Sequence, residues 1–171
     1  MIGSASIGFP GEAVDATVVA INVSDGGVPK RPVPDAYVGV DGMAGDRQAN
    51  LVYHGGPDRA VCLYSLERIQ ALQAEGHPIT AGATGENLTV SGLDWDHVVP
   101  GAKLRVGAIV VLEITSYTKP CRKIQTTLSD HKFSRLSQKH FPGWSRVYAK
   151  VEKPGRIRVG DRIELIARDH A

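Results

Sequence analysis

Short runs rich in Val, Ile, Leu and Thr, separated by glycine and proline, recur along the whole chain. In several of them apolar and polar positions alternate, which is the pattern of a strand with one face in the core. The 19 glycines and 10 prolines among the 171 residues separate these runs at the spacing of a β-barrel or sandwich. We therefore predict a mainly β fold. The predicted strands are Ala16–Val23, Ala60–Tyr64, Asn87–Val90, Lys103–Val106, Ala108–Tyr117, Arg146–Val151 and Asp161–Ala167.

One segment, "SLERIQALQAEGHP", has the periodicity of an amphipathic helix. Ser65 is the expected N-cap, apolar residues recur at helical spacing, and Gly76 followed by Pro78 is a stop signal. We predict a helix that begins after Ser65 and packs its apolar stripe on the core.

A second segment, "SDHKFSRLSQKHFPG", has a weaker helical pattern. A helix that starts at Ser129 or Asp130 would bury Phe133 and Leu136 and end before the proline-glycine pair. The basic side chains expected on its exposed face are Lys132, Arg135 and Lys139.

Two stretches near the end of the chain resemble each other. "GAKLRVGAIVVLEI" and "GRIRVGDRIELIA" each contain a short strand, a Val-Gly corner and a longer strand, as two hairpins of one barrel would. Earlier, residues 25–45 are too rich in Gly, Pro and Asp for regular structure, apart from a short strand at Tyr37–Val40. We expect this segment to form a long loop near a functional site.

Composition describes an ordinary soluble domain. With 42% hydrophobic and 22% charged residues, one domain spanning residues 1–171 is expected. The net charge is +2 and the chain has no run of like charges, so the sequence does not indicate a basic surface that would bind nucleic acid. Small anions are the favoured partners. The sequence shows neither a leader nor an apolar run of about 18 residues. We expect a cytoplasmic protein that has no membrane partner.

One of the two cysteines, Cys121, stands in the basic stretch "TKPCRKI". Lys119, Arg122 and Lys123 would stabilise a thiolate there, and a thiolate binds soft metals or attacks electrophiles. The alternative is that Cys121 is a small buried hydrophobic residue, as the apolar run "AVCLY" indicates for Cys62. From these residues alone, Cys121 could be a metal ligand, a nucleophile or a small buried hydrophobic residue.

Two glycine-containing stretches precede predicted strands. In "GDRQANLVYHGGPDRAVCLYS" the glycines allow backbone amides to approach a ligand, and a histidine and an aspartate lie four positions apart. The candidate residues there are His54, Gly55, Gly56 and Asp58, with His54 also a possible base for Cys121. In "GATGENLTVSGL" the candidates are Glu86 and Asn87. Ordinary turn chemistry would also account for both stretches.

Several common sites are excluded by spacing. The chain has no C-x-x-C and no H-x-x-x-H for zinc, and no glycine fingerprint of a Rossmann site or a P-loop. Two cysteines cannot hold an iron–sulfur cluster through cysteine ligands alone. An internal redox chain is therefore not indicated.

Taken together, the three stretches resemble the MOSC domain, the module named for the C-terminal part of molybdenum-cofactor sulfurase. "GDRQANLVYHGGPDRAVCLYS", "GENLTVSGLDWDHVVPGAKLRVGAIVVLEIT" and "KPCRKI" occur in the family's order over residues 45–124, and the pattern around Gly160–Leu165 also fits. The chain is similar to single-domain bacterial MOSC proteins. The resemblance implies a MOSC-type β-barrel with a few short peripheral helices.

The resemblance also implies a cofactor. In enzymes of this family the cysteine that aligns with Cys121 is the protein's ligand to molybdenum, and the other sulfur ligands come from the pterin dithiolene. Cys121 would then be the catalytic and metal-binding residue of a molybdenum cofactor (Mo-pterin) site. The residues implied in shaping the pocket and holding the anionic cofactor are His54, Gly55, Gly56, Asp58, Glu86, Asn87, Lys119 and Arg122.

Two functions are compatible with this resemblance. The first is a reductase of N-hydroxylated compounds, such as N-hydroxylated bases and amidoximes, which receives electrons from a separate reductase docked near Lys132, Arg135 and Lys139. The second is a non-catalytic module that binds the molybdenum cofactor or carries sulfur as a Cys121 persulfide. No part of the chain resembles the pyridoxal-phosphate desulfurase domain of the sulfurase, so pyridoxal phosphate is implied for the family only.

Overall fold

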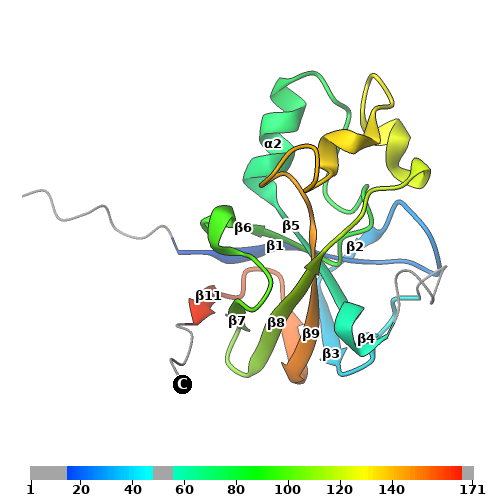
Figure 1. The fold of residues 1–171 in the computed structure, drawn as a ribbon. Helices are drawn as coiled ribbons and strands as arrows, with labels where there is room; N and C mark the ends of the chain where they lie inside the picture. Colours follow the sequence, from blue (N-terminus) through cyan, green and yellow to red (C-terminus); the bar gives the residue numbers. More distant parts are fainter. Residues whose placement is uncertain (1–14, 48–55, 167–171) are drawn as a thin grey trace, which may run out of the picture.

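The computed structural model describes residues 15–47 and 56–166, which form a curved sheet with short helices at one end (Figure 1). The strands are β1 (Thr17–Val23), β2 (Arg31–Val33), β3 (Asp35–Gly39), β4 (Gly42–Met43), β5 (Val61–Ser65), β6 (Leu88–Ser91), β7 (Lys103–Val106), β8 (Val110–Tyr117), β9 (Val147–Lys153), β10 (Gly155–Arg158) and β11 (Ile163–Ile166). The helical elements are α2 (Leu66–Ala74) and the 3₁₀ turns η1 (Pro57–Arg59), η2 (Trp95–His97), η3 (Arg122–Thr127) and η4 (Phe133–Leu136). The mainly β prediction is confirmed.

Eight strands form one mixed sheet in the order β11-β7-β8-β9-β5-β6-β1-β2, and β10, β3 and β4 form a small second sheet. Only the β5–β6 pair among the described strands is parallel. All seven predicted strands are present, with ends that differ by at most two residues within the described chain. Alternation of apolar and polar positions was therefore a sound guide, because one face of each strand packs on a shared core.

The closed barrel that the resemblance implies is not confirmed by the strand pairing of the described residues. β11 and β2 are the two ends of the large sheet, and no continuous ladder joins them. The sheet curls strongly, since the start of β1 exchanges backbone hydrogen bonds with the chain that leads into β11: the Val18 amide donates to Asp161 and the Ile163 amide donates to Ala16, each at 2.9 Å. The described residues thus form a curved mixed sheet.

The two similar stretches adopt different structures. β7 and β8 form the predicted antiparallel hairpin, with Val106 opposite Val110. The second stretch is not a hairpin: β10 pairs with β3, and β11 pairs with β7. The prediction of two equivalent hairpins is therefore wrong, because the chain crosses from the small sheet to the large one at the second Val-Gly corner.

Residues 25–45 contain more regular structure than expected. The predicted short strand is present as β3, and β2 and β4 flank it. Their pairing partners are β1 and β3, respectively, so these short strands lie at sheet edges where proline and glycine are tolerated.

The first predicted helix is confirmed and the second is wrong. Ser65 caps α2 as expected, because its hydroxyl accepts a hydrogen bond from the Arg68 amide at 3.2 Å. The second segment forms only the 3₁₀ turn η4. His131 has a φ of 57°, a left-handed conformation that prevents a right-handed helix from starting there. None of the helices among the described residues is long and apolar enough to span a membrane.

The turn before β6 depends on a close backbone approach, which yields a prediction. A Cβ on Gly82 would lie 2.6 Å from the Lys30 carbonyl oxygen, whereas a Cβ on Gly27 would meet nothing within 4 Å. Both glycines have similar positive φ values, 81° and 79°. Gly27→Ala should therefore cost about 1–2 kcal/mol of strain, and Gly82→Ala should cost about 1–3 kcal/mol more from overpacking. Denaturant unfolding of both variants measures the difference; equal losses would contradict it.

Candidate functional site

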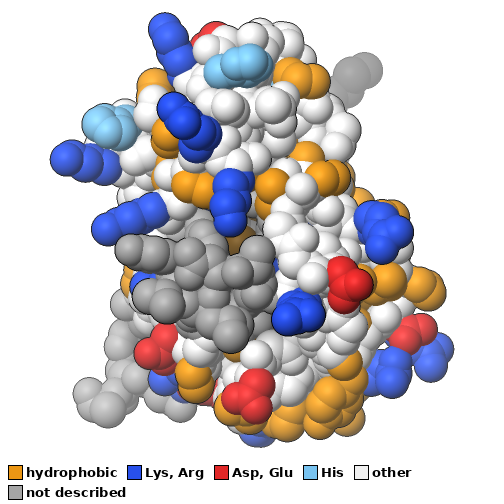
Figure 2. Space-filling model, turned by 90° about the vertical axis from the view of Figure 1, so that its right-hand side faces the viewer, with side chains coloured by type: hydrophobic (Ala, Val, Ile, Leu, Met, Phe, Trp, Pro, Cys, Tyr) orange, Lys and Arg blue, Asp and Glu red, His pale blue; other side chains and the backbone are white. Residues whose placement is uncertain are grey.

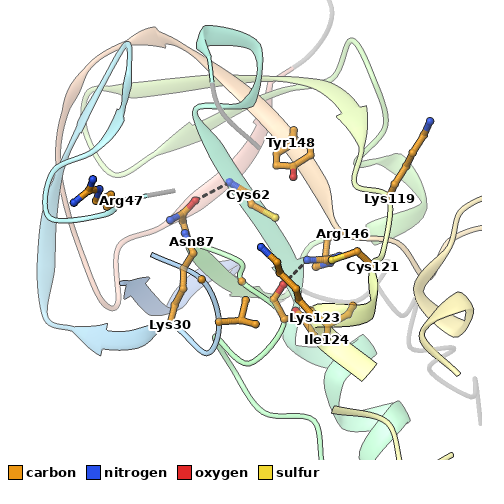
Figure 3. A pocket seen from close by; sticks show the side chains of 14 residues that line it. Lys30, Arg47, Cys62, Asn87, Lys119, Cys121, Lys123, Ile124, Arg146 and Tyr148 are labelled. Carbon is orange, nitrogen blue, oxygen red and sulfur yellow. Dashed lines mark hydrogen bonds between the residues drawn. The ribbon is translucent and has the colours of Figure 1, made fainter. Parts of the chain in front are cut away.

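An open cavity lies where the turn before β6, the start of β9 and the segment after β8 meet (Figure 3). Its walls contain both cysteines of the chain. The lining residues are Gly27, Val28, Lys30, Arg47, Cys62, Thr84, Gly85, Asn87, Lys119, Cys121, Lys123, Ile124, Arg146 and Tyr148. The sequence stretches around residues 45, 85 and 121, which are far apart in the chain, therefore meet at one site.

The charge of the cavity is strongly one-sided. Among the described residues that line it, five are lysine or arginine and none is acidic, although the whole chain has a net charge of only +2. Figure 2 shows basic side chains over the upper part of one face, while acidic side chains lie mostly in its lower half. Concentrated positive charge in a hollow favours an anionic ligand. This agrees with the small anions expected from the sequence.

Cys121 is held at the point where the chain turns from β8 into η3. It is the N-cap residue of η3, its carbonyl accepts a hydrogen bond from the Ile124 amide at 3.1 Å, and its side chain is half-buried. The thiol therefore lines the cavity and is open to solvent. His54, the expected base for this thiol, lies outside the described residues, as does Gly55.

Cys62 is the second residue of β5 and is 5% exposed, which confirms the expectation that it is buried. Burial raises the pKa of its thiol, and the positive charge of Arg146 opposes this in part. Its sulfur lies 3.8 Å from the Thr118 hydroxyl oxygen. Sequence reasoning missed that this buried cysteine also lines the cavity, because strand alternation alone does not reveal what lies at the open end of a strand.

Asn87 connects the cavity wall to two strands. Its side-chain oxygen accepts from the Cys62 amide at 2.9 Å, and its Nδ2 donates to Asp46 at 2.8 Å. Asp46 also forms a 2.6 Å ion pair with Lys30, and both of these side chains are largely buried. The amide of Asn87 therefore organises the wall, and only part of it remains available to a ligand.

Glu86 lies beneath the cavity and does not line it. The residue is completely buried, and its carboxylate accepts hydrogen bonds from the Gly82 amide and from the hydroxyls of Thr84 and Thr89. These three donors occupy both oxygens. Glu86 therefore holds the turn and does not itself line the cavity.

The remaining predicted residues lie at the rim or away from the cavity. Gly56 and Asp58 are exposed at η1 and do not line it, and Thr115 donates a hydrogen bond to the Asp58 carbonyl. Arg122 is exposed and also absent from the lining. Lys119 lines the rim, but Figure 3 shows its side chain directed away from the other labelled groups.

Sequence reasoning missed two of the cations that line the cavity, Lys30 and Arg146. Arg146 is 5% exposed at the start of β9, and its Nη1 donates to the Thr84 carbonyl. Lys30 and Arg47 come from the segment around the predicted long loop, which confirms that this loop lies near the site. The sequence holds one signal for Arg146, because it stands at the entry of an apolar strand, where a charged side chain is rarely buried without a partner.

If the chain binds the molybdenum cofactor that the resemblance implies, the residues of this cavity would hold it. Among the described residues no three His, Cys, Asp or Glu side chains lie together as a metal cage. The donor set that is present, a single accessible thiol among cations, fits a metal whose other ligands belong to an anionic cofactor. The residues therefore fit the implied group.

The two thiols should differ in reactivity. Near neutral pH, iodoacetamide should label Cys121 to completion before Cys62 reacts, because Cys121 is accessible while burial both shields Cys62 and raises its pKa. Mass spectrometry of peptides during labelling measures both rates. Faster labelling of Cys62 in the folded protein would contradict this geometry.

Comparison with known proteins finds several similar chains. YflK of Bacillus subtilis is 34% identical over 144 residues, which is 83% of this chain and 64% of YflK, so the chain spans less than two thirds of that relative. A protein of Gibberella moniliformis named "Reductase" is 30% identical over 139 residues, 78% of this chain and 24% of its own length. The crystal structure of YiiM from Geobacillus stearothermophilus has 28% identity and a TM-score of 0.70, with coverage of 91% of this chain and 77% of that one. The MOSC domain signature matches residues 50–164, and the chain belongs to the MOSC domain family.

Proposed function

We propose that the protein binds the molybdenum cofactor in this cavity and reduces N-hydroxylated compounds there. The observation that carries the proposal is the accessible Cys121 thiol in a hollow lined by five cations and no acid. Family membership supports it, because the cysteine at this position is the metal ligand in MOSC enzymes. When bound, the metal would supply two-electron reduction of an N–O bond.

The chain's own residues would bind and orient this cofactor. Cys121 would be the protein's ligand to the metal, with its backbone fixed by η3. Lys123, together with Arg47 from the opposite segment, would attract the anionic cofactor, and Lys119 would contribute at the rim. Arg122, Gly56 and Asp58 do not line the cavity, so any effect that they have on the cofactor would come from outside it.

A reductase role has one further support. The Gibberella moniliformis relative is named "Reductase", and the 139 aligned residues are 78% of this chain and 24% of that longer protein. N-hydroxylated bases and amidoximes are the substrate class that we propose for this chain. The cavity would admit a small substrate beside Cys121.

A sulfur-carrier function is the second candidate. Cys121 is half-buried beside a lysine, and an accessible, cation-flanked thiol also suits a persulfide that is passed to a partner. In this case the cavity would bind the cofactor or a sulfur acceptor without reducing a substrate.

The proposed reductase needs electrons from a separate partner. Arg135 is not available to the docking surface predicted from the sequence. It pairs with Glu75 at 2.7 Å, and its guanidinium stacks on Trp144 at 4.0 Å from the ring centroid. Lys132 and Lys139 are exposed and stay available. We propose that an electron-donor protein approaches this side of the molecule, guided by the remaining positive charge.

The ligand role of Cys121 can be tested by metal content. When the protein is purified from a host that makes the cofactor, Cys121→Ala should lose most of its molybdenum and remain folded. Cys62→Ala is the matched control: it should keep the metal but lose about 1 kcal/mol or more of stability, because its side chain is buried. Molybdenum and pterin per chain are measured with the unfolding free energy. Equal metal content in wild type and Cys121→Ala would refute the ligand assignment.

The two candidate functions separate in an activity assay. Fully loaded protein should reduce an N-hydroxylated base with a chemical one-electron donor and should not do so with NADH alone. Turnover with NADH alone would contradict the need for a partner. No turnover with either donor, at full molybdenum loading, would favour the carrier function.

A further inference from the structure

One wall of the cavity carries three protic side chains that are linked in series. Tyr148 and Cys62 line the cavity, and Thr118 is buried beside them at 2% exposure. The Thr118 hydroxyl oxygen is 3.8 Å from the Cys62 sulfur, and the same hydroxyl forms a hydrogen bond with the Tyr148 side chain. The metal-binding role proposed for Cys121 uses none of these three groups.

Three adjacent strands fix the position of Tyr148. It lies on β9 opposite Cys62 of β5, and on its other side it is opposite Ser116 of β8. The Thr118 amide donates to the Arg146 carbonyl at 3.0 Å, which continues the contact between the chains of β8 and β9 toward the cavity. Figure 3 shows the Tyr148 hydroxyl oxygen directed into the cavity.

The Tyr148 hydroxyl is a proton donor throughout the neutral pH range. Burial is the main cause that raises its pKa, and the positive charges of Arg146 and Arg59 oppose this rise in part. The Arg59 guanidinium lies 5.8 Å from the centroid of the Tyr148 ring. The phenol is therefore protonated at neutral pH, and the two guanidinium groups favour the phenolate that a proton transfer would leave.

The other hydroxyl and amide side chains of the cavity wall hold the wall itself. The Thr84 hydroxyl donates to Glu86, and the Asn87 side chain makes three hydrogen bonds to neighbouring segments. Tyr148 is the remaining hydroxyl among the described residues that line the cavity. The cations of the cavity suit an anionic oxygen, whereas an N-hydroxyl group is neutral and is matched by a neutral O–H donor.

We propose that Tyr148 is a catalytic residue, whose hydroxyl donates a hydrogen bond to the N-hydroxyl oxygen of the substrate and gives that oxygen a proton as the N–O bond breaks. Thr118 is a positioning residue, which orients the phenol through its own hydroxyl. This role of Tyr148 rests on the proposed function and deepens it, because it names the group that recognises the N-hydroxylated substrate.

The step balances with one proton from the phenol and one from solvent. The N–O bond takes up two electrons, which the electron-donor protein of the proposed function supplies through the cofactor. The phenol proton forms a new O–H bond, and the hydroxyl group leaves as water. A solvent proton completes the N–H bond of the product, and water in the open cavity returns a proton to Tyr148.

Binding without turnover tests the contact to the N-hydroxyl oxygen. Isothermal titration calorimetry of the full chain, loaded with molybdenum and given no electron donor, compares N-hydroxyadenine with adenine, which lacks only that oxygen. Tyr148→Phe should weaken binding of N-hydroxyadenine about three- to tenfold and leave adenine binding unchanged, as expected for loss of one neutral hydrogen bond. Thr118→Val removes the other hydroxyl and should act in the same direction. Tyr117→Phe is the matched control and should bind like wild type, because Tyr117 does not line the cavity.

Turnover with a chemical electron donor tests the proton transfer. The kcat for N-hydroxyadenine should fall about a hundredfold in Tyr148→Phe at the molybdenum content of wild type. A wild-type value of either quantity in this variant, the affinity ratio or kcat, would overturn the role of Tyr148 and leave the proposed function standing. Loss of molybdenum from folded Tyr148→Phe would also overturn it, because the residue would then hold the cofactor. If fully loaded wild type neither prefers nor reduces N-hydroxyadenine, the proposed function itself fails, and the role of Tyr148 with it.

Discussion

The buried carboxylate of Glu86 is the constraint on which the cavity depends. It accepts hydrogen bonds from the Gly82 amide and the Thr84 hydroxyl of its own turn and from the Thr89 hydroxyl of β6, and so ties that turn to the sheet. The turn then presents the Thr84 carbonyl to Arg146 and the Asn87 amide to Cys62. One enclosed acid therefore positions groups from β5, β6 and β9 around a single hollow.

Positive charge can gather in this hollow because the sheet supplies the rigidity. Basic residues from three distant segments face one another, which would be unfavourable unless their backbones were held by strands and by the turn. A bound anion would offset the cost of this arrangement. Cys121 lines the same cavity, so in the proposed function the thiol and these cations would act together on one anionic cofactor.

The sequence predicted strands well and tertiary detail poorly. Alternation located β7 and β8 and their hairpin, because that pairing is local. It could not reveal that β10 and β11 belong to different sheets, since partner choice depends on distant segments. In the site, basic neighbours singled out Cys121, but Arg146 and the inward position of Cys62 depend on contacts across the fold that no local pattern records. Glu86 looked like a ligand contact and instead holds the turn.

The most direct test of the account is the number of sulfur atoms bound to molybdenum in the loaded protein. X-ray absorption at the molybdenum edge counts these scatterers without reference to activity. Coordination by Cys121 predicts a sulfur ligand in addition to those that the pterin dithiolene provides in the free cofactor. A sulfur shell identical to that of the free cofactor, in protein that retains its molybdenum, would contradict the claim that Cys121 holds the metal.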